Sequence, residues 1–211
     1  MTTAIIGTGG LGSAIARELA AGGETLRLAS ADHESAQTLA AKIGPAATAA
    51  DGDRDALDGA DAVILALRFT VLESVLAELA DRLADKLVVV PSNPVTADAQ
   101  GRISRVLPDG QASGRTVAGW LPAGTRLVMA FGTLPAELLE SSSNQSPQRA
   151  ALFYATDDDR TVQPVERLIQ TAGFEPVRVG GLDQSSRLEV GGDLHGLVVG
   201  PARARSLASR G

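Results

Sequence analysis

Four glycines near the N-terminus have a spacing suited to binding phosphate groups. The segment Gly7-Thr8-Gly9-Gly10-Leu11-Gly12 fits the pattern G-x-G-x-x-G and lies between an apolar run and an amphipathic segment. In such a loop the first glycine permits a tight turn, the second lets the backbone approach a pyrophosphate, and the third lets a helix pack closely on a strand. The helix N-terminus then offers unpaired N–H groups and a partial positive charge to the phosphates. We therefore predict that Gly7, Thr8, Gly9, Gly10, Leu11 and Gly12 contact a dinucleotide; a glycine turn without a ligand is the alternative.

The end of the second expected strand decides which dinucleotide fits. NAD sites carry a carboxylate about 20 residues after the glycines, where it binds the ribose 2′-hydroxyl. This chain reads Ala29-Ser30-Ala31 at that point, and its first acid, Asp32, comes slightly late. A small residue followed by a hydroxyl leaves room for a 2′-phosphate, with Ser30 as donor and Arg27 and His33 as the nearest cations. We predict NADP as the preferred cofactor, with NAD as the alternative.

The order of apolar segments predicts the scaffold that positions these residues. Short apolar runs predict strands at residues 4–6, 25–29, 61–67, 86–90, 126–130 and 150–155. Helical periodicity predicts helices at residues 11–19, 33–43, 69–83 and 162–172. Strands that alternate with helices of this length imply parallel pairing and right-handed crossovers. The predicted fold class is α/β: a Rossmann-type, doubly wound, mainly parallel sheet with a small C-terminal α/β extension.

The same pattern suggests how the chain is divided. A dinucleotide-binding domain is expected over residues 1–134, and a small substrate-side extension packed on it over residues 135–211. Proline and glycine crowd between Ser92 and Gly124, which predicts a long loop, and loops of that length are usually functional. The tail from Pro201 to Gly211 is small and basic and is expected to fray.

Composition excludes several classes of function. The 211 residues carry 25 Asp and Glu against 19 Lys and Arg, so a basic face for nucleic acid is not expected. There is no cysteine and there are two histidines, which argues against disulfides, thiolate nucleophiles and metal sites. No apolar run approaches the roughly 20 residues that cross a bilayer, and the N-terminus lacks the basic region of a signal peptide. We expect a cytoplasmic protein whose partner is a small molecule, without metal, membrane or nucleic acid.

Several later motifs follow one another in a distinctive order. Ser92-Asn93-Pro94 follows the strand expected at 86–90, and Ala130-Phe131-Gly132-Thr133-Leu134-Pro135-Ala136 follows the strand expected at 126–130. Further on, Gly180-Gly181-Leu182 leads into Ser186-Arg187-Leu188-Glu189. Together with the N-terminal glycine loop, these motifs make the chain resemble the NADP oxidoreductases that depend on coenzyme F420, a deazaflavin, over roughly residues 3–195. The resemblance implies NADP as cofactor, coenzyme F420 as co-substrate, and hydride transfer between them.

The resemblance also implies roles for individual residues. Ser30 would face the 2′-phosphate, and Ala66, Leu67 and Arg68 would line the dinucleotide. Asn93 and Pro94 would flank the nicotinamide, and Ala130 and Phe131 would lie where the nicotinamide meets the deazaflavin. The chain departs from the family at Ala31, where arginine is common, and at Arg68, where proline is frequent. Arg68 is therefore a candidate for the missing cation.

The chain has few side chains suited to acid–base catalysis. Hydride transfer between two cofactor rings needs position and a dry cleft but no obligatory side-chain acid or base, so no catalytic side chain is predicted. The Tyr-x-x-x-Lys pair of short-chain dehydrogenases is absent, because Tyr154 is followed by Asp158. Two alternatives stay open: an NAD(P)H-dependent reductase of another small molecule, and a non-catalytic NAD(P)-binding redox sensor or regulatory module. The moderately apolar segment Leu188–Val199 makes a homodimer possible.

The remaining candidates have both structural and functional interpretations. His195 could contact the second substrate or be locally structural, and Arg187 could bind its anionic part or pair with Glu189. Trp120 is expected to anchor packing, and Asp157-Asp158-Asp159 to cap a helix rather than bind metal. Arg102, Arg105 and Arg115 are expected to be solvated loop charges that could also favour anionic ligands.

Overall fold

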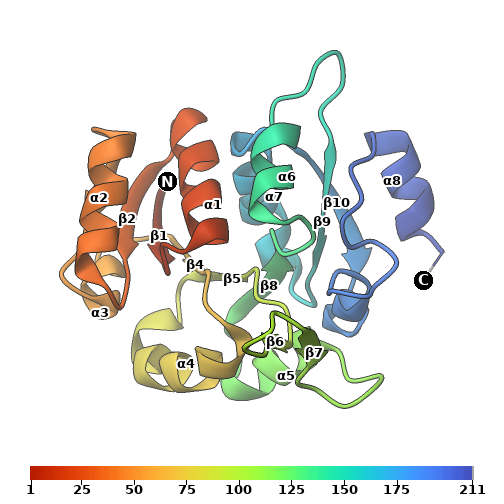
Figure 1. Cartoon of the computed structure of the whole chain (residues 1–211), viewed down its shortest axis with the longest axis horizontal. Coiled ribbons are helices and arrows are strands. Elements are labelled where there is room, and N and C mark those ends of the chain that lie inside the picture. Colours follow the sequence, from red (N-terminus) through yellow and green to blue (C-terminus); the bar gives the residue numbers. More distant parts are fainter. Residues whose placement is uncertain (211) are drawn as a thin grey trace.

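The computed structural model describes residues 1–210. Its centre is one eight-stranded sheet (Figure 1). Its strands are β1 (Thr2–Ile6), β2 (Thr25–Ala29), β3 (Ala47–Ala49), β4 (Ala62–Leu65), β5 (Leu87–Val90), β8 (Arg126–Ala130), β9 (Ala151–Ala155) and β10 (Glu175–Gly180). A separate hairpin consists of β6 (Val95–Ala97) and β7 (Ile103–Arg105). The helices are α1 (Gly10–Ala21), α2 (His33–Ile43), α3 (Asp53–Ala56), α4 (Phe69–Leu83), α5 (Ser113–Trp120), α6 (Ala136–Ser142), α7 (Val162–Thr171) and α8 (Pro201–Ala208). Residues 1–210 also form two short 3-10 helices, η1 (Asp159–Thr161) and η2 (Leu182–Arg187).

The strand order is β10-β9-β8-β5-β4-β1-β2-β3. Neighbouring strands pair in parallel, except that β8 and β9 are antiparallel. The predicted Rossmann-type α/β fold is confirmed. Because β1 lies between β2 and β4, the winding direction changes there, and ligands of such sheets bind outside the carboxyl ends of the strands at that point.

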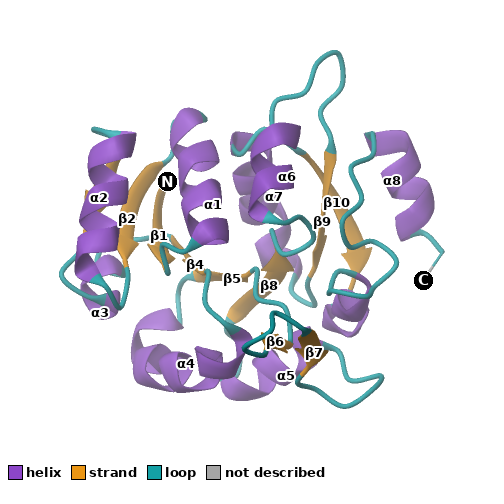
Figure 2. Cartoon of the chain, in the orientation of Figure 1, coloured by secondary structure: helices purple, strands orange, loops and turns teal. Residues whose placement is uncertain are grey.

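Helices cover both faces of the sheet (Figure 2). Helices α1, α2, α6 and α7 bury their apolar residues against one face, among them Ile15, Leu19 and Leu168. Helices α3, α4, α5 and α8 cover the other face, where Leu72, Leu76 and Val117 are buried. This double coverage explains why β4 and β5 are apolar and buried at every position.

The segment between Ser92 and Gly124 is more ordered than expected. It contains the β6–β7 hairpin and helix α5, so the prediction of one long loop was wrong. The hairpin was missed because β6 and β7 have three residues each and are mostly exposed. Helix α5 was missed because its two glycines weaken the local helix signal.

The tail also differs from the expectation of fraying. Residues Pro201–Ala208 form α8, which begins with a proline in its first turn and buries Ala204 completely against the sheet face. Proline suits a helix start because its missing N–H would have no helical partner there. Gly211 lies outside the described residues.

The expected division at residues 134 and 135 falls between strands of the same sheet, so it stays a prediction. Within Leu188–Val199, Leu188 and Leu194 are buried in this chain's own core, whereas Val190 and Val198 are exposed. The homodimer therefore also stays a prediction. Among the helices formed by residues 1–210, none combines the length and apolarity needed to span a membrane.

Candidate functional site

The glycine loop joins β1 to α1 at the switch point of the sheet. Gly7 has φ +98°, and a Cβ there would lie 2.4 Å from the carbonyl oxygen of Ala66. A Cβ on Gly12 would lie 1.9 Å from the Gly7 carbonyl oxygen, whereas one on Gly9 would have no heavy atom within 4 Å. The first and third glycines thus permit the turn and the close packing, and the second leaves open space beside the backbone.

The start of α1 is shaped to receive a polar ligand. Gly9 caps the helix in an extended conformation, and Ser13 is fixed by two bonds: its N–H donates to Gly9 O and its Oγ donates to Thr8 O, both at 2.8 Å. The N–H groups of the first turn, which includes Gly10 and Leu11, have no acceptor within the helix. Thr8 Oγ1 is buried and has no hydrogen-bond partner among residues 1–210.

The end of β2 is where the ribose of a dinucleotide would be recognised. Ser30 follows the strand directly, and its hydroxyl bonds to no other group in residues 1–210. Asp32 caps α2 by accepting the Glu34 N–H at 3.2 Å, which explains why the first acid comes late. Helix capping thus explains why the first carboxylate after the glycine loop lies slightly beyond the end of β2.

Of the cations considered for the 2′-phosphate, two are engaged elsewhere. Arg27 donates to the Asp55 carbonyl at 2.8 Å, and His33 lies 2.9 Å from Gln37 Nε2. Arg68 caps α4 and is exposed, and it forms no ion pair within the described residues. Arg68 lies beyond the end of β4, two strands from β2, directly after Ala66 and Leu67, which follow β4. Of the two arginines, Arg68 is the one without an ion pair in residues 1–210.

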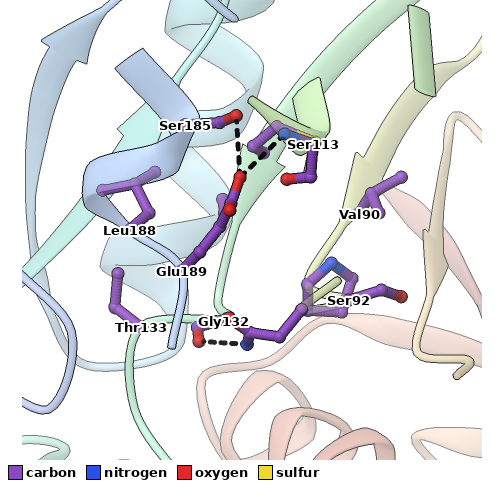
Figure 3. Close-up of a pocket in the computed structure, with 12 residues that line it drawn as sticks. Val90, Ser92, Ser113, Gly132, Thr133, Ser185, Leu188 and Glu189 are labelled. Atoms are coloured by element: carbon purple, nitrogen blue, oxygen red, sulfur yellow. Dashed lines mark hydrogen bonds between the residues drawn. The ribbon is translucent and has the colours of Figure 1, made fainter. Parts of the chain in front are cut away.

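A cavity of about 260 Å³ lies at the carboxyl ends of β5 and β8 (Figure 3). Its lining residues are Val90, Pro91, Ser92, Asn93, Ser113, Met129, Ala130, Gly132, Thr133, Ser185, Leu188 and Glu189. They come from the end of β5, the start of α5, the end of β8, and η2 with the residues just after it, so segments far apart in sequence meet here. This is the edge at which the glycine loop lies.

Hydrogen bonds hold the loops around this cavity. Asn93 Nδ2 donates to Gly132 O at 2.9 Å, and Asn93 Oδ1 accepts the Val190 N–H at 2.7 Å. Ser92 Oγ donates to Leu67 O at 2.6 Å, which ties the end of β5 to the end of β4. Asn93 therefore lines the cavity while both groups of its amide fix the surrounding backbone.

Two of the residues expected around the rings have side chains that do not line this cavity. Phe131 has φ 66° and its side chain is fully buried in the core on the α1 side, so it does not line the cavity. Pro94 is buried at the base of the β6–β7 hairpin, where its carbonyl accepts the Val106 N–H at 2.9 Å. Ala130 and Asn93 are the members of that expected group that reach the cavity.

A buried carboxylate was not found by the sequence analysis. Glu189 is 4% exposed; its Oε1 accepts the Ser113 N–H at 2.8 Å and its Oε2 pairs with Arg105 at 2.6 Å. Ser185 Oγ donates to the same carboxylate at 3.4 Å and accepts the Gly114 N–H at 2.8 Å (Figure 3). Arg105 is thus a partner in a buried pair rather than a solvated loop charge. The Ser-Arg-Leu-Glu motif marked Glu189, but its partner lies 84 positions away.

Arg187 pairs with Asp193 at 2.9 Å, not with Glu189, and donates to the last carbonyls of α8. His195 is partly buried, and burial lowers the pKa of its imidazole below the ordinary value. The next residue, Gly196, donates its N–H to Thr133 O at 2.7 Å, so this segment adjoins the cavity.

Other candidates have structural roles. Trp120 packs on Phe69 with ring centroids 5.3 Å apart, which confirms the packing interpretation. Asp158 caps η1 by accepting the Arg160 N–H, whereas Asp157 pairs with Arg115. Arg102 pairs with Asp98 on the hairpin. Across residues 1–210, no group of three acidic or histidine side chains could hold a metal ion.

Comparisons with known proteins agree with the motifs. Residues 2–94 match the model of a family described as NADP oxidoreductase, coenzyme F420-dependent. The F420-dependent NADP reductase of Methanothermobacter thermautotrophicus is 27% identical over 199 residues, which cover 90% of this chain and 85% of that protein.

Solved structures are similar over most of the chain. The hypothetical protein SMa0349 from Sinorhizobium meliloti has a TM-score of 0.84 and 28% identity, and the match covers 95% of this chain and 96% of that one. A protein from Arthrobacter sp. FB24, named as a candidate F420-dependent NADP reductase, has a TM-score of 0.74 at 19% identity. The match covers 87% of this chain and 86% of that one. At this identity the likeness shows the shared fold alone. The resemblance predicted from the motifs is confirmed: the chain is similar to the coenzyme F420-dependent NADP oxidoreductases in sequence, most clearly over residues 2–94.

Proposed function

We propose that this protein is an NADP(H)-dependent oxidoreductase that passes a hydride between the nicotinamide and a deazaflavin such as coenzyme F420. The family match and the Methanothermobacter relative support NADP-linked oxidoreduction, and the finer assignment of the acceptor rests on the coenzyme for which both are named. The observation that carries the proposal is the open glycine loop at the same edge of the sheet as a largely apolar cavity.

The residues present fit a dinucleotide. The space beside Gly9 is free of heavy atoms within 4 Å, so a phosphate could approach the backbone there. Thr8 Oγ1 is a buried hydroxyl without a partner in residues 1–210, and such groups normally have one. The unpaired N–H groups of the first turn of α1 would bind the pyrophosphate, because they point at it and the helix dipole favours negative charge.

Preference for NADP would rest on Ser30 and Arg68. Ser30 has a hydroxyl available at the end of β2, and the small, exposed Ala31 beside it leaves room for a phosphate. Arg68 supplies a positive charge without an ion-pair partner among the described residues. Asp32 is used as a helix cap, so its carboxylate is oriented toward α2.

When both are bound, NADPH would supply a hydride (one hydrogen with two electrons) to the deazaflavin ring, and one proton from solvent would complete the reduced product. The chain's own residues position the rings and exclude water. Asn93 joins the loop after β5 to the loop after β8 and to Val190, so three segments keep their spacing. Apolar side chains such as Val90, Met129 and Leu188 keep this edge dry. No side-chain acid or base is required.

The test is an anaerobic reaction of purified protein with NADPH and oxidised coenzyme F420, followed by loss of the deazaflavin's visible absorbance. We expect a protein-dependent decay that is faster with NADPH than with NADH. Absence of decay, with NADPH binding still detected by fluorescence, would overturn the acceptor assignment. That result would leave the reductase of another small molecule and the redox sensor as the remaining hypotheses.

A further inference from the structure

Two hydroxyl-bearing residues that line the cavity at the ends of β5 and β8 have no hydrogen-bond partner for that hydroxyl among residues 1–210. Ser113 Oγ and Thr133 Oγ1 are buried and have no hydrogen-bond partner among residues 1–210, and both residues line this cavity. Ser113 is 0% exposed and Thr133 is 2% exposed. Leaving a buried hydroxyl unpaired costs about 1–3 kcal/mol, so each group has hydrogen-bonding capacity that a water or a ligand entering the cavity can satisfy.

Several other polar groups of the cavity already have partners. The N–H groups of Ser113 and Gly114 at the start of α5 are taken by Glu189 and Ser185. The Asn93 amide and the Ser92 hydroxyl bind surrounding backbone. The first two N–H groups of α5 are therefore taken, and Ser113 and Thr133 carry the side-chain hydroxyls of the cavity lining that have no partner among residues 1–210.

Charge around the cavity excludes an anionic ligand. Glu189 is buried in the wall and its charge is balanced by Arg105 at 2.6 Å. A phosphate or carboxylate would lie beside this carboxylate without a free cation to compensate it, at a high cost in a buried place. A neutral group avoids that cost.

The two hydroxyls and the size of the cavity further limit the chemical classes of ligand that could bind. A hydroxyl can donate or accept, so a pair of them suits a group that presents an N–H beside a C=O. The cavity is small, since its space of about 260 Å³ includes open solvent at its mouth, so only the end of a ligand would enter it. Apolar neighbours such as Met129 and Leu188 suit the flat face of a ring.

We propose that Ser113 and Thr133 recognise a neutral, planar amide edge of a bound ring, which makes them specificity-determining residues of this site. The inference rests on the proposed function, which offers two sources of that chemistry. One is the carboxamide of the nicotinamide, and the other is the imide edge of the deazaflavin. Both present N–H beside C=O.

The test compares Ser113→Ala and Thr133→Val with Thr116→Val. Thr116 lies one turn further along α5, and its hydroxyl donates to Ala112 O at 3.3 Å and accepts from Gln111, outside the cavity. Dissociation constants for NADPH and for oxidised coenzyme F420 are measured separately by fluorescence. Thermal unfolding is measured without ligands.

We expect Ser113→Ala and Thr133→Val to melt at or above the wild-type temperature, because each removes a polar group that is unpaired in the free protein. Each should weaken one of the two ligands about tenfold. A selective loss for NADPH, together with weak wild-type binding of its 3-acetylpyridine analogue, identifies the carboxamide. A selective loss for coenzyme F420 identifies the imide edge.

Two outcomes overturn the proposals, and they can be told apart. If the wild type binds both ligands and the two variants bind them as tightly as Thr116→Val does, the recognition role is wrong and the proposed function stands. If the wild type binds neither NADPH nor coenzyme F420, the proposed function is wrong and this role falls with it.

Discussion

A Cβ placed on Gly12 would lie 1.9 Å from the carbonyl oxygen of Gly7, a separation that no packed structure tolerates. The contact ties the first turn of α1 to the end of β1, and it leaves no room for a side chain between them. By contrast, a Cβ on Gly9 would have no heavy atom within 4 Å, in a backbone conformation that any residue can adopt. Two glycines of one motif thus have different physical roles, one in packing and one in leaving space.

The first prediction separates these roles with one methyl group at each position. Gly12→Ala should destabilise the fold by about 1–3 kcal/mol or more, because the helix must move away from the strand. Gly9→Ala should have a free energy of unfolding within about 0.5 kcal/mol of the wild-type value. It should nevertheless bind NADPH at least about tenfold more weakly, because its methyl group occupies the space left for the phosphates. Urea unfolding and NADPH fluorescence titration measure the two effects. Equal stability of the two variants would contradict the packing role of Gly12.

The second prediction concerns the 2′-phosphate. Ala31→Arg should strengthen NADPH binding several-fold and leave NADH binding nearly unchanged, since the added cation lies beside Ser30 at an exposed position. Arg68→Gln should weaken NADPH binding and reduce its dependence on salt. Fluorescence titrations with both nucleotides at two salt concentrations measure these changes.

A control for net charge is Ala21→Arg, which adds the same charge at the exposed end of α1, away from the loop. It should alter neither nucleotide's affinity. If Ala31→Arg and Ala21→Arg change the affinity for NADPH equally, or if Ala31→Arg strengthens NADH binding as much as NADPH binding, the end of β2 does not recognise the 2′-phosphate.

The third prediction concerns the pair of Arg105 and Glu189. Arg105→Met should destabilise the protein by about 1–3 kcal/mol, because it leaves a buried carboxylate without its cation while Arg105 itself is partly exposed. Glu189→Gln combined with Arg105→Met should cost less than the sum of the single changes. Arg102→Met, which breaks an exposed pair with Asp98, is the control and should cost at most about 1 kcal/mol. Additive free energies of unfolding would contradict the coupling.

The sequence predicted those elements whose residues carry a strong local signal. Strand β4 is apolar at every position, and helix α4 repeats its apolar residues at helical spacing, so both were predicted with nearly the observed bounds. Strand β10 was missed because Pro176 and Arg178 interrupt its apolar pattern. Its place at the edge of the sheet tolerates such residues.

The candidate site divides in the same way. The glycine loop is local in sequence, and its turn and packing follow from the residue types. The cavity combines residues from four separate segments, and the bond between Glu189 and Arg105 joins positions 84 apart. Nothing in a short window of sequence pairs those two residues, because their contact depends on how η2 and the hairpin pack. Phe131 shows the converse, since its motif is local but its side chain turns into the core.

The last prediction concerns pH and His195. Burial lowers the pKa of His195 below the 6.5 of a free side chain, so the folded state binds a proton more weakly than the unfolded state. Above the pKa of the unfolded state the ring is neutral in both states, and its burial does not depend on pH. As the pH falls from that pKa toward the lower pKa of the folded state, the free energy of unfolding decreases. Wild type should therefore lose stability relative to His195→Gln between about pH 7.5 and 5, by no more than about 1.4 kcal/mol per pH unit for one proton. Urea unfolding across this range measures the difference, and the same series on His33→Gln shows what removal of the other histidine does. A difference between wild type and His195→Gln that stays constant, or grows in favour of wild type on acidification, would contradict the burial of a neutral ring beside the cavity.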